Sequence, residues 1–562
     1  MSRSFGNTAL AAAGCAALLA SGCGHRNDPG PLSAMVTAVI PATAQEIPNP
    51  LRGQYEDLLQ PLFPQVNPAQ QGYPPWPPAY DAGLRVSWRQ LQPTNPRTLP
   101  ADAPDDRRFD FRVIDDALND AGNRNMRLML RVYAYNSCCD ASYPGNTNIA
   151  IPDWMRYAAT SYPGPQQWWW TPGVTQVVPN WNDHRYLDAF GALLAALGRR
   201  YDRDERLSVF EFSGYGDFSE DHIAYLRDAL GAPGPEPDES VAKLGYYSQF
   251  RDQSITIGSI RQLVAANVNA FPHTQLVVNE PNPEIVRELL ADDVTRRLAA
   301  PVGIRSDCLG VYAPLPIWAE SDASYYVRSK DPLVNEIKDR LASAPVITEW
   351  CQLPAGTEAR SYYAKALRDV IRYHVSMTAS YDFPDQGSNK PMDRDLYVLW
   401  AQANVSAGYR YSVAARPGSE SLRDGVARVA VTWTNYGSAV ASETWVPVYR
   451  LVDFSGRVIR TLPATVALRR LVADHVEGTG EEPLPASSEE TVSVDLKGLA
   501  PGHYTLRASV DWQQHKPGAS RVVNYAPMAL ARAGRDDSGG YPIAKLDIAR
   551  DVRPRTLNGR VN

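Results

Sequence analysis

The sequence predicts an α/β fold, a (β/α)8 TIM barrel, followed by a C-terminal antiparallel β-sandwich domain. Between about residues 49 and 383, short β-branched or aromatic runs alternate with amphipathic helical patterns, which is typical of a parallel sheet. Eight such units are enough to close a barrel. After about Gly408 the helical patterns give way to short alternating runs separated by turn sequences, the pattern of an antiparallel sandwich.

The barrel strands are expected in eight short runs. They lie near 52–55 and at 84–88, 127–133, 207–212, 275–279, 303–308, 345–348 and 376–381. Helical periodicity between these runs is clear at 111–121, 186–197 and 362–373.

The sandwich strands are expected in the last third of the chain. The alternating runs lie at 409–413, 428–434, 444–451, 491–496 and 504–512. The change of pattern puts the domain boundary between Ala401 and Tyr409, so the barrel is assigned to 46–407 and the sandwich to 408–562. We expect the sandwich to pack on the flank of the barrel.

The first 22 residues have the pattern of an export signal, with Arg3 followed by a short apolar run. The run ends in Ala-Ser-Gly-Cys, which resembles the lipobox of bacterial lipoproteins, whose cysteine is acylated and becomes the N-terminus. This resemblance implies lipidation of Cys23, a tether over 23–45 and a lipid anchor in the membrane of the cell envelope, on the periplasmic side or in the outer membrane. An ordinary secretory peptide, cut near Ser21 or Gly22, is the alternative.

Charge and cysteine usage narrow the set of partners. The net charge of -6 provides no basic surface for nucleic acid. The cysteines form no CxxC and no histidine stands at metal-ligand spacing, so neither a metal nor a cofactor is predicted. Adjacent Cys138 and Cys139 would strain to pair with each other, and we expect one of them to pair with Cys308 or Cys351.

Aromatic residues are abundant, with 13 Trp and 29 Tyr. Such rings cover the apolar faces of sugars, and they also fill large cores. A long segment, 136–183, separates the third expected strand from its helix and contains Trp154, Trp168–Trp170 and Trp181. In a barrel this segment lies at the C-terminal face of the strands, where active sites sit. Its rings either bind a ligand or form a small core of their own.

Several motifs resemble known families. RVSWRQLQPT (85–94), FDFRVIDDALNDA (109–121), MRLMLRVYAYN (126–136) and IPDWM (151–155) resemble the second and third strands of clan A glycoside hydrolases, particularly family 42 β-galactosidases. NPLRGQYE (49–56), SGYGDFSEDH (213–222) and GIRSDCLG (303–310) resemble motifs of a bacterial family with domain of unknown function 4832. These resemblances imply the barrel and a sugar-hydrolase-like cleft, and the second family brings no established reaction.

Two carboxylates are the candidate catalytic residues. The resemblance to clan A implies an acid/base after the fourth strand and a nucleophile after the seventh, where this sequence has Glu220 and Glu349. Retaining glycosidases hold two such carboxyls about 5–5.5 Å apart. Asp217 is the local rival of Glu220, because Ser219 replaces the asparagine that usually precedes the acid. A structural salt bridge is the alternative role of Glu349.

A mouth that recognises hydroxyls needs fixed donors, acceptors and aromatic faces. The candidate substrate-binding residues are Arg52, Trp88, Arg131, Asn136, Trp154, Asp217, Arg305, Asp307, Trp350 and Tyr381. Arg305 and Asp307 share one face of their strand, and the alternative to substrate binding is an ion pair between them. Glu211 would be able to pair with Arg85 or Arg131.

These observations lead to one hypothesis and two alternatives. The hypothesis is a cell-envelope, retaining glycoside hydrolase that acts on an oligo- or polysaccharide. The first alternative is a catalytically inactive barrel that binds glycans, with the sandwich as an accessory module. The second is a structural lipoprotein of a polysaccharide-export assembly. Fold alone does not decide among them.

Overall fold

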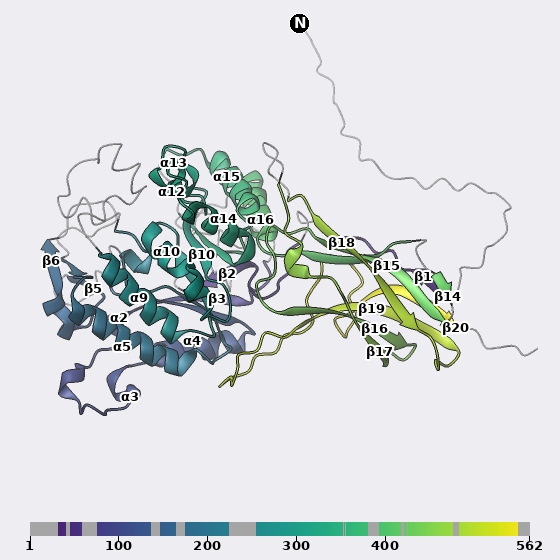
Figure 1. Ribbon diagram of the computed structural model, residues 1–562, viewed down its shortest axis with the longest axis horizontal. Coiled ribbons are helices and arrows are strands. Elements are labelled where there is room, and N and C mark those ends of the chain that lie inside the picture. Colours follow the sequence, from purple (N-terminus) through teal and green to yellow (C-terminus); the bar gives the residue numbers. More distant parts are fainter. Residues whose placement is uncertain are drawn as a thin grey trace, which may run out of the picture.

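The computed structural model describes residues 32–40, 45–58, 76–136, 147–163, 175–223, 255–351, 353, 356–379, 393–417, 421–423, 425–475 and 483–548. Helices surround a barrel in one half of the molecule, and the other half consists mainly of β-strands (Figure 1). Within these ranges, no helix combines the length and apolar character that crossing a membrane requires. Cys23, Cys138, Cys139, Trp168–Trp170 and Tyr381 lie outside them.

The barrel is a closed ring of parallel strands. In chain order these are β2 (Gly53–Asp57), β3 (Asp81–Ser87), β4 (Arg127–Tyr133), β8 (Leu207–Glu211), β9 (Gln275–Asn279), β10 (Gly303–Leu309), β11 (Val346–Trp350) and β12 (Met377–Ala379). Each strand pairs with the next, and β12 pairs with β2 to close the ring. All eight expected strands are confirmed.

Helices connect the strands and pack on the outside of the ring. Their bounds are α2 (Trp88–Leu91), α3 (Asp105–Arg108), α4 (Arg112–Asn123), α5 (His184–Tyr201), α9 (Ile257–Ala270), α10 (Pro283–Leu290), α11 (Asp292–Thr295), α12 (Ile317–Glu320), α13 (Tyr325–Arg328), α14 (Leu333–Ser343), α15 (Ala359–Arg372) and α16 (Arg394–Ser406). The three expected helices correspond to α4, α5 and α15. The long segment after β4 adds a small sheet of β5 (Thr147–Ile149), β6 (Ala159–Pro163) and β7 (Thr175–Pro179).

The inside of the barrel changes from apolar to charged along the strands. Met129, Val209 and Ile347 belong to a buried apolar cluster inside the ring. Side chains alternate along a strand, so the residue two positions further on points to the same side. On β4, β8 and β11 that next inward residue is charged, as the site below describes. The apolar cluster therefore forms the floor on which a charged layer stands.

The β-rich half is a sandwich of two antiparallel sheets. One sheet has the order β1 (Leu32–Ala34), β20 (Tyr541–Ile548), β19 (Gly502–Trp512), β16 (Trp445–Asp453) and β17 (Val458–Pro463). The other contains β13 (Tyr411–Ala415), β15 (Val426–Asn435), β14 (Ser421–Arg423) and β18 (Ala486–Asp495). Residues of both sheets, Trp433 and Val510 among them, share one core.

The expected sandwich strands correspond to β13, β15, β16, β18 and β19. The sequence reading missed β14, β17 and β20. It also assigned Leu32–Ala34 to the tether, whereas this segment pairs with β20 as an edge strand. Backbone pairing with an exposed edge needs few side-chain signals, which is why a segment with so little apolar periodicity forms a strand.

The sandwich packs on the N-terminal end of the barrel, and the expectation that it covers the flank was wrong. Arg127, the first residue of β4, binds Glu443 of the sandwich. The Lys516 ammonium donates to the carbonyl of Leu207, the first residue of β8, and to Thr274, just before β9. Parallel barrel strands all begin at one end, so these contacts lie opposite the C-terminal mouth.

Candidate functional site

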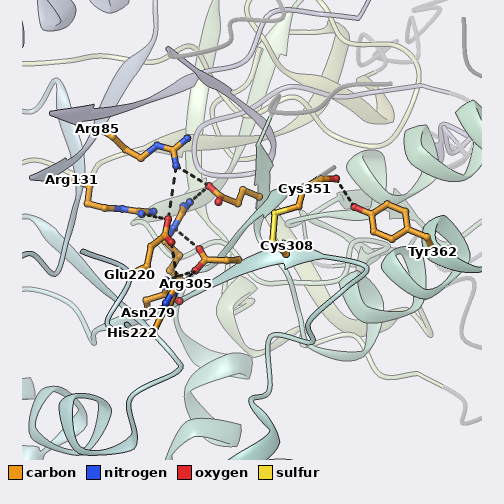
Figure 2. The surroundings of a disulfide bond; sticks show 11 residues. Arg85, Arg131, Glu220, His222, Asn279, Arg305, Cys308, Cys351 and Tyr362 are labelled. Atoms are coloured by element: carbon orange, nitrogen blue, oxygen red, sulfur yellow. Dashed lines mark hydrogen bonds and ion pairs between the residues drawn. A yellow bond between two sulfur atoms is a disulfide. The ribbon is translucent and has the colours of Figure 1, made fainter. Parts of the chain in front are cut away.

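A layer of buried charged side chains occupies the C-terminal end of the barrel. Figure 2 shows the side chains of Arg85, Arg131, Arg305 and Glu220 meeting above the strands. We call the following residues the charged layer: Asp57, Arg85, Arg131, Glu211, Glu220, His222, Arg305, Asp307 and Glu349. The layer unites most of the sequence-predicted polar residues in one place.

Glu349 is held by two arginines from different strands. It lies on β11, two residues beyond the floor residue Ile347, and is 6% exposed. Arg305 on β10 donates to its Oε2, and Nη1 of Arg85 on β3 lies 3.8 Å from the same oxygen. Arg305 also donates to the Tyr55 hydroxyl at 3.2 Å. These contacts fix the position of the Glu349 carboxyl group.

Glu220 reaches the layer from the loop after β8. The loop folds back through positive φ values at Phe218, Ser219 and Asp221, and a Cβ on Gly216 would lie 2.6 Å from the carbonyl oxygen of His222. The close approach requires glycine at position 216. This compact turn aims the Glu220 side chain inward.

One arginine joins the two candidate catalytic carboxylates. Nη1 of Arg131 donates to Oε1 of Glu220 at 2.8 Å, while Nε of Arg131 donates to Glu211 at 2.7 Å. Nη1 of Arg85 lies 3.9 Å from Oε1 of Glu220 and 3.8 Å from Oε2 of Glu349. These two oxygens are therefore no further apart than the sum of those two distances, and they belong to one site.

His222 and Asp307 complete the layer beside Glu220. Nε2 of His222 lies 3.4 Å from Oε2 of Glu220 and 4.0 Å from Oδ2 of Asp307. Asn279, the last residue of β9, donates to the same Asp307 oxygen at 2.7 Å. Nε of Arg305 lies 3.6 Å from Oδ1 of Asp307, so the pairing of these two residues considered from the sequence occurs.

Ionisation divides the carboxyls of the layer into two kinds. Burial alone would raise the pKa of Glu220, but the hydrogen bond from His222 and the charge of Arg131 outweigh it and lower that pKa to about 2. Burial, with the charges of Glu220 and Glu349, raises the pKa of Asp307 to about 7. Although burial opposes its charge, the hydrogen bond to Glu220 raises the pKa of His222. Glu220 is therefore ionised at neutral pH, and protons reside on its neighbours.

Glu220, His222 and Asp307 have the residue types that bind metal ions, and their polar atoms lie within 4.8 Å of one another. Their other contacts argue against a metal here. The Arg131 guanidinium donates to Glu220, and the Arg305 guanidinium lies beside Asp307. A divalent cation would be repelled by both guanidiniums at short range. We therefore assign these residues to proton chemistry, as the charge balance of the layer favours.

A disulfide joins the two strands that carry Asp307 and Glu349. Cys308 pairs with Cys351, with a Cα–Cα distance of 4.7 Å. The expected pairing of either residue with Cys138 or Cys139 was wrong. β10 and β11 are neighbours in the barrel, so their C-terminal ends are close enough to bond. Figure 2 shows this bond beside the charged layer, with the Tyr362 hydroxyl donating to the Cys351 carbonyl.

Arg52 was predicted at the mouth, and the structure corrects this. Its guanidinium donates to Glu46 and to the carbonyls of Val405 and Ala407. Arg52 precedes β2, so it lies at the N-terminal end of the barrel, where a parallel strand begins. It is a structural residue that ties the chain before β2 to the end of the last helix.

The tryptophans predicted to bind sugar are packing residues. Trp88 is fully buried, and its ring packs edge-on against Trp154 at a centroid distance of 6.0 Å. Both indoles donate to Gln92, to its side chain and its carbonyl respectively. Trp350 follows Glu349 and points to the opposite side of the strand, where it donates to Asn404. Their apolar area serves the core between the barrel and its helices.

Asn136 and Asp217 are both buried. The Asn136 carbonyl accepts from Asn148, and the backbone amide of Asp217 donates to the His222 carbonyl at 2.8 Å. Asp217 thus belongs to the turn that carries Glu220, rather than replacing Glu220 in its contact with Arg131. Tyr381 lies outside the described residues.

Five residues of the site were absent from the set of candidate catalytic and substrate-binding residues, namely Asp57, Arg85, Glu211, His222 and Asn279. Arg85 and Arg131 are paired across β3 and β4, and Asp57 accepts from Arg85 at 3.0 Å. Asn279 ends β9 at the same height, paired with Arg305 in the sheet. For Arg85, Asp57 and Asn279 the available signal was alternation, because they lie two residues beyond the barrel-lining positions Gly83, Tyr55 and Val277 respectively.

No family model matches the chain, and no curated protein matches it. The resemblance to the family with domain of unknown function 4832 therefore stays a prediction. Among solved structures, the chain is similar to endo-glycoceramidase II from Rhodococcus sp., seen as a lactosyl-enzyme intermediate. The identity is 11% and the TM-score 0.36, over 80% of this chain and 99% of that chain.

Two further similar structures are also sugar-cleaving enzymes by name. A glycoside hydrolase family 5 enzyme from Prevotella bryantii B14 has 10% identity and a TM-score of 0.28, over 58% of this chain and 82% of its own. A β-galactosidase from Rahnella sp. R3 has 14% identity and a TM-score of 0.31, over 66% and 59%. Likeness at this level assigns no function, and the barrel is established by its own strand pairing.

Proposed function

We propose that the chain is a retaining glycoside hydrolase of the cell envelope that acts on an oligo- or polysaccharide, with Glu349 as nucleophile and Glu220 as acid/base. One observation carries the proposal. Glu349 lies near the end of the seventh strand of a parallel barrel and Glu220 follows the fourth, and both lie close to the same guanidinium nitrogen of Arg85, at 3.8 and 3.9 Å. Paired carboxylates at the mouth of one barrel are the minimum machinery for cleaving a glycosidic bond.

The reaction has two balanced steps. An oxygen of Glu349 attacks the anomeric carbon while the glycosidic C–O bond breaks, and Glu220 gives a proton to the departing oxygen. Water then attacks the same carbon, Glu220 takes its proton, and the bond to Glu349 breaks. Arg305 donates to Oε2 of Glu349 and so orients its carboxylate for the attack. Arg85 lies between the carboxylates and offsets their mutual repulsion.

Replacement of the nucleophile tests this assignment. Glu349→Gln keeps the shape and hydrogen-bonding reach of the side chain but removes its nucleophilic charge, so kcat should fall by at least about 10³-fold with the fold intact. Turnover is measured on a panel of 4-nitrophenyl glycosides and envelope polysaccharides. Glu336→Gln, an exposed change on α14, is the matched control. A Glu349→Gln variant with wild-type turnover contradicts the proposal.

The stereochemical outcome is a separate test. Retention requires carboxyls about 5–5.5 Å apart, whereas inversion leaves room for a water at about 6.5–9.5 Å. We expect ¹H NMR of the first product to show the same anomer as the substrate. An inverted first product would keep the hydrolase assignment but remove Glu349 from the nucleophilic role.

A second candidate function is a glycan-binding barrel without catalysis. Two observations favour it: the low pKa of Glu220 leaves its resting carboxyl without a proton to donate, and Ser219 stands where clan A hydrolases have asparagine. The Ser219 hydroxyl instead accepts from the Gly214 amide and donates to the Val132 carbonyl within the barrel. Saturable binding of a glycan that the wild-type protein never cleaves would favour this candidate.

The envelope location is part of the proposal and is tested by fractionation. Cys23→Ser should move the protein from the membrane to the soluble fraction, because two acyl chains are needed for stable anchoring. Wild-type protein should stay with membranes after a high-salt wash. If Cys23→Ser also stays there, the lipid anchor is excluded.

A further inference from the structure

The imidazole of His222 is bracketed by two carboxylates of the site. Its Nε2 lies 3.4 Å from Oε2 of Glu220 and 4.0 Å from Oδ2 of Asp307. We propose that His222 stores the proton of the reaction and loads it onto Oε2 of Glu220 before the glycosidic bond breaks. This inference rests on the proposed hydrolase function. Because His222 acts through Glu220, it is a positioning residue rather than a group that touches substrate.

The two oxygens of Glu220 have different surroundings. Oε1 accepts the hydrogen bond from Arg131 at 2.8 Å and lies 3.9 Å from Arg85. Oε2 lies on the side of His222. A proton on Oε1 would displace a charge-assisted hydrogen bond, whereas a proton on Oε2 replaces one that His222 already provides. Oε2 is therefore the oxygen that can be loaded at least cost.

Asp307 approaches the same ring nitrogen, Nε2, as Glu220 does. Its Oδ2 is fixed by Asn279 at 2.7 Å, so the carboxylate stays near Nε2 instead of turning away. The Glu220 and His222 side chains are 9% exposed and that of Asp307 is 12% exposed. With so little water around them, these three groups exchange protons mainly with one another. Proton transfer over Nε2 needs a movement of a few tenths of an ångström from the resting distance to Glu220.

Charged groups on its own loop and on the neighbouring elements determine the pKa of the His222 imidazole. They are Asp217, Glu220 and Asp221 on its own loop, Asp307 and Arg305 on β10, Arg131 on β4, and Glu280 after β9. The carboxyls favour the imidazolium, and the two guanidiniums oppose it. The net direction is a raised pKa for His222 and a lowered pKa for Glu220. In the resting site the proton is therefore on His222.

The proton balance closes over one turnover. Nε2 of His222 gives its proton to Oε2 of Glu220, which leaves a neutral imidazole. Glu220 passes that proton to the departing oxygen as the glycosidic C–O bond breaks and Glu349 bonds to the anomeric carbon. Glu220 then takes a proton from the attacking water, and its return to Nε2 restores the imidazolium.

The pH profile of His222→Gln gives the sharpest test. Glutamine keeps a donor near Glu220 but stores no proton. The remaining donor is Glu220 itself, whose pKa is below that of His222, so the alkaline limb of kcat should shift to lower pH by at least about one unit. If Glu220 works alone, loss of a positive neighbour raises its pKa, and the limb shifts to higher pH. The two explanations predict opposite signs.

The leaving group separates proton delivery from binding. At pH 7, kcat of His222→Gln should fall about 10- to 100-fold on alkyl glycosides and less than about 3-fold on 4-nitrophenyl glycosides, with KM unchanged. An equal loss on both substrates, or a change confined to KM, overturns the proposal. His184→Gln, at a largely exposed histidine on α5, is the matched control and should leave both substrates unaffected.

A second measurement tests the proposal even if His222→Gln does not fold or the protein is not a hydrolase. The ¹⁵N NMR titration of the wild-type imidazoles, with Asp307→Asn as the second variant, requires no turnover. His222 should titrate above the ordinary histidine value, and Asp307→Asn should lower its pKa because a bracketing carboxylate is lost. A His222 that is neutral at pH 6 overturns the proton store. Absence of turnover on every glycan, with a raised His222 pKa, overturns only the hydrolase function. Loss of wild-type activity in EDTA, restored by Zn²⁺, would replace the proton store by a metal.

Discussion

The two ends of the barrel both bury ion pairs, but their charge balance differs. At the N-terminal end, both guanidinium nitrogens Nη1 and Nη2 of Arg127 donate to the two oxygens of Glu443, at 2.6 and 2.9 Å. Trp512 gives Glu443 a further hydrogen bond. Glu443 thus accepts three hydrogen bonds from buried donors, which is the arrangement expected of a junction that holds two domains together.

At the C-terminal end, carboxyls outnumber guanidiniums. Arg85, Arg131 and Arg305 are shared among five carboxylates of the charged layer, namely Asp57, Glu211, Glu220, Asp307 and Glu349. Next to Glu220 and Asn279 in the chain, burial raises the pKa values of Asp221 and Glu280 well above the ordinary range. Protons bound to some of these carboxyls offset the excess of negative charge. A matched ion pair stabilises structure, whereas an excess of acids that share protons is an arrangement for proton transfer.

The largest effect on stability is expected at the N-terminal end of the barrel. Glu443→Gln removes the hydrogen-bonded counter-ion of the buried Arg127 and leaves only Asp81, at 3.9 Å, which should lower the free energy of unfolding by about 3–5 kcal/mol. Turnover at 25 °C should stay at the wild-type value, since the mouth is at the opposite end. Denaturant unfolding gives the first quantity and a standard assay the second. Glu489→Gln, whose pair with Arg416 is exposed, should change stability little.

A similar loss of activity and stability in Glu443→Gln would contradict the separation of the two ends. It would mean that the sandwich controls the mouth through the barrel.

The disulfide at the mouth should have the next largest effect. Replacing Cys308 and Cys351 by serine opens a link across a sequence separation of 43 residues, which should cost about 2–4 kcal/mol. Because Asp307 and Glu349 lie one and two residues from these cysteines, kcat should fall as well, in contrast to Glu443→Gln. Reduction of the wild-type protein with dithiothreitol should reproduce both changes. Loss of stability without loss of turnover would make the disulfide a purely structural link.

Much of the fold follows from local sequence patterns. Several barrel strands, such as β4 (RLMLRVY) and β9 (QLVVN), are largely apolar runs, and burial on both faces of a parallel sheet makes such runs distinct. β17 was missed because its side chains are largely exposed and lack a buried face. β1 was missed because it is held by backbone pairing with β20. The predicted position of the sandwich was wrong because domain packing depends on single residue pairs, such as Arg127 with Glu443. Such pairs produce no periodic pattern in the sequence.

The candidate site was predictable where strand position decides the direction of a side chain. Arg131, Arg305, Asp307 and Glu349 lie on strands at inward positions, and the sequence reading included all four. Trp88 and Trp350 were misassigned because residue type suited sugar binding. Trp88 instead begins α2, Trp350 alternates with the inward Glu349 on β11, and both rings are buried in the core. The disulfide was misassigned because partners in adjacent strands become neighbours only once the order of the ring is known.

The smallest change in stability is expected for Asp307→Asn. This variant also gives the most specific test of the difference between the two ends of the barrel. The folded-state pKa of Asp307 is about 7, above its ordinary value of 3.8, so folding takes up a proton. The stability that this group contributes is complete below about pH 4 and is lost as the pH rises through 7. Asparagine keeps the size of the side chain and removes the charge. The variant should therefore match wild type near pH 4 and exceed it by about 1–2 kcal/mol at pH 8, by denaturant unfolding at both pH values. Removal of a carboxylate charge would thus stabilise the C-terminal end of the barrel, whereas Glu443→Gln destabilises the N-terminal end. If Asp307→Asn is less stable than wild type at pH 8, the ionised carboxylate is held favourably by Arg305 and His222, and the mouth carries no excess of acid.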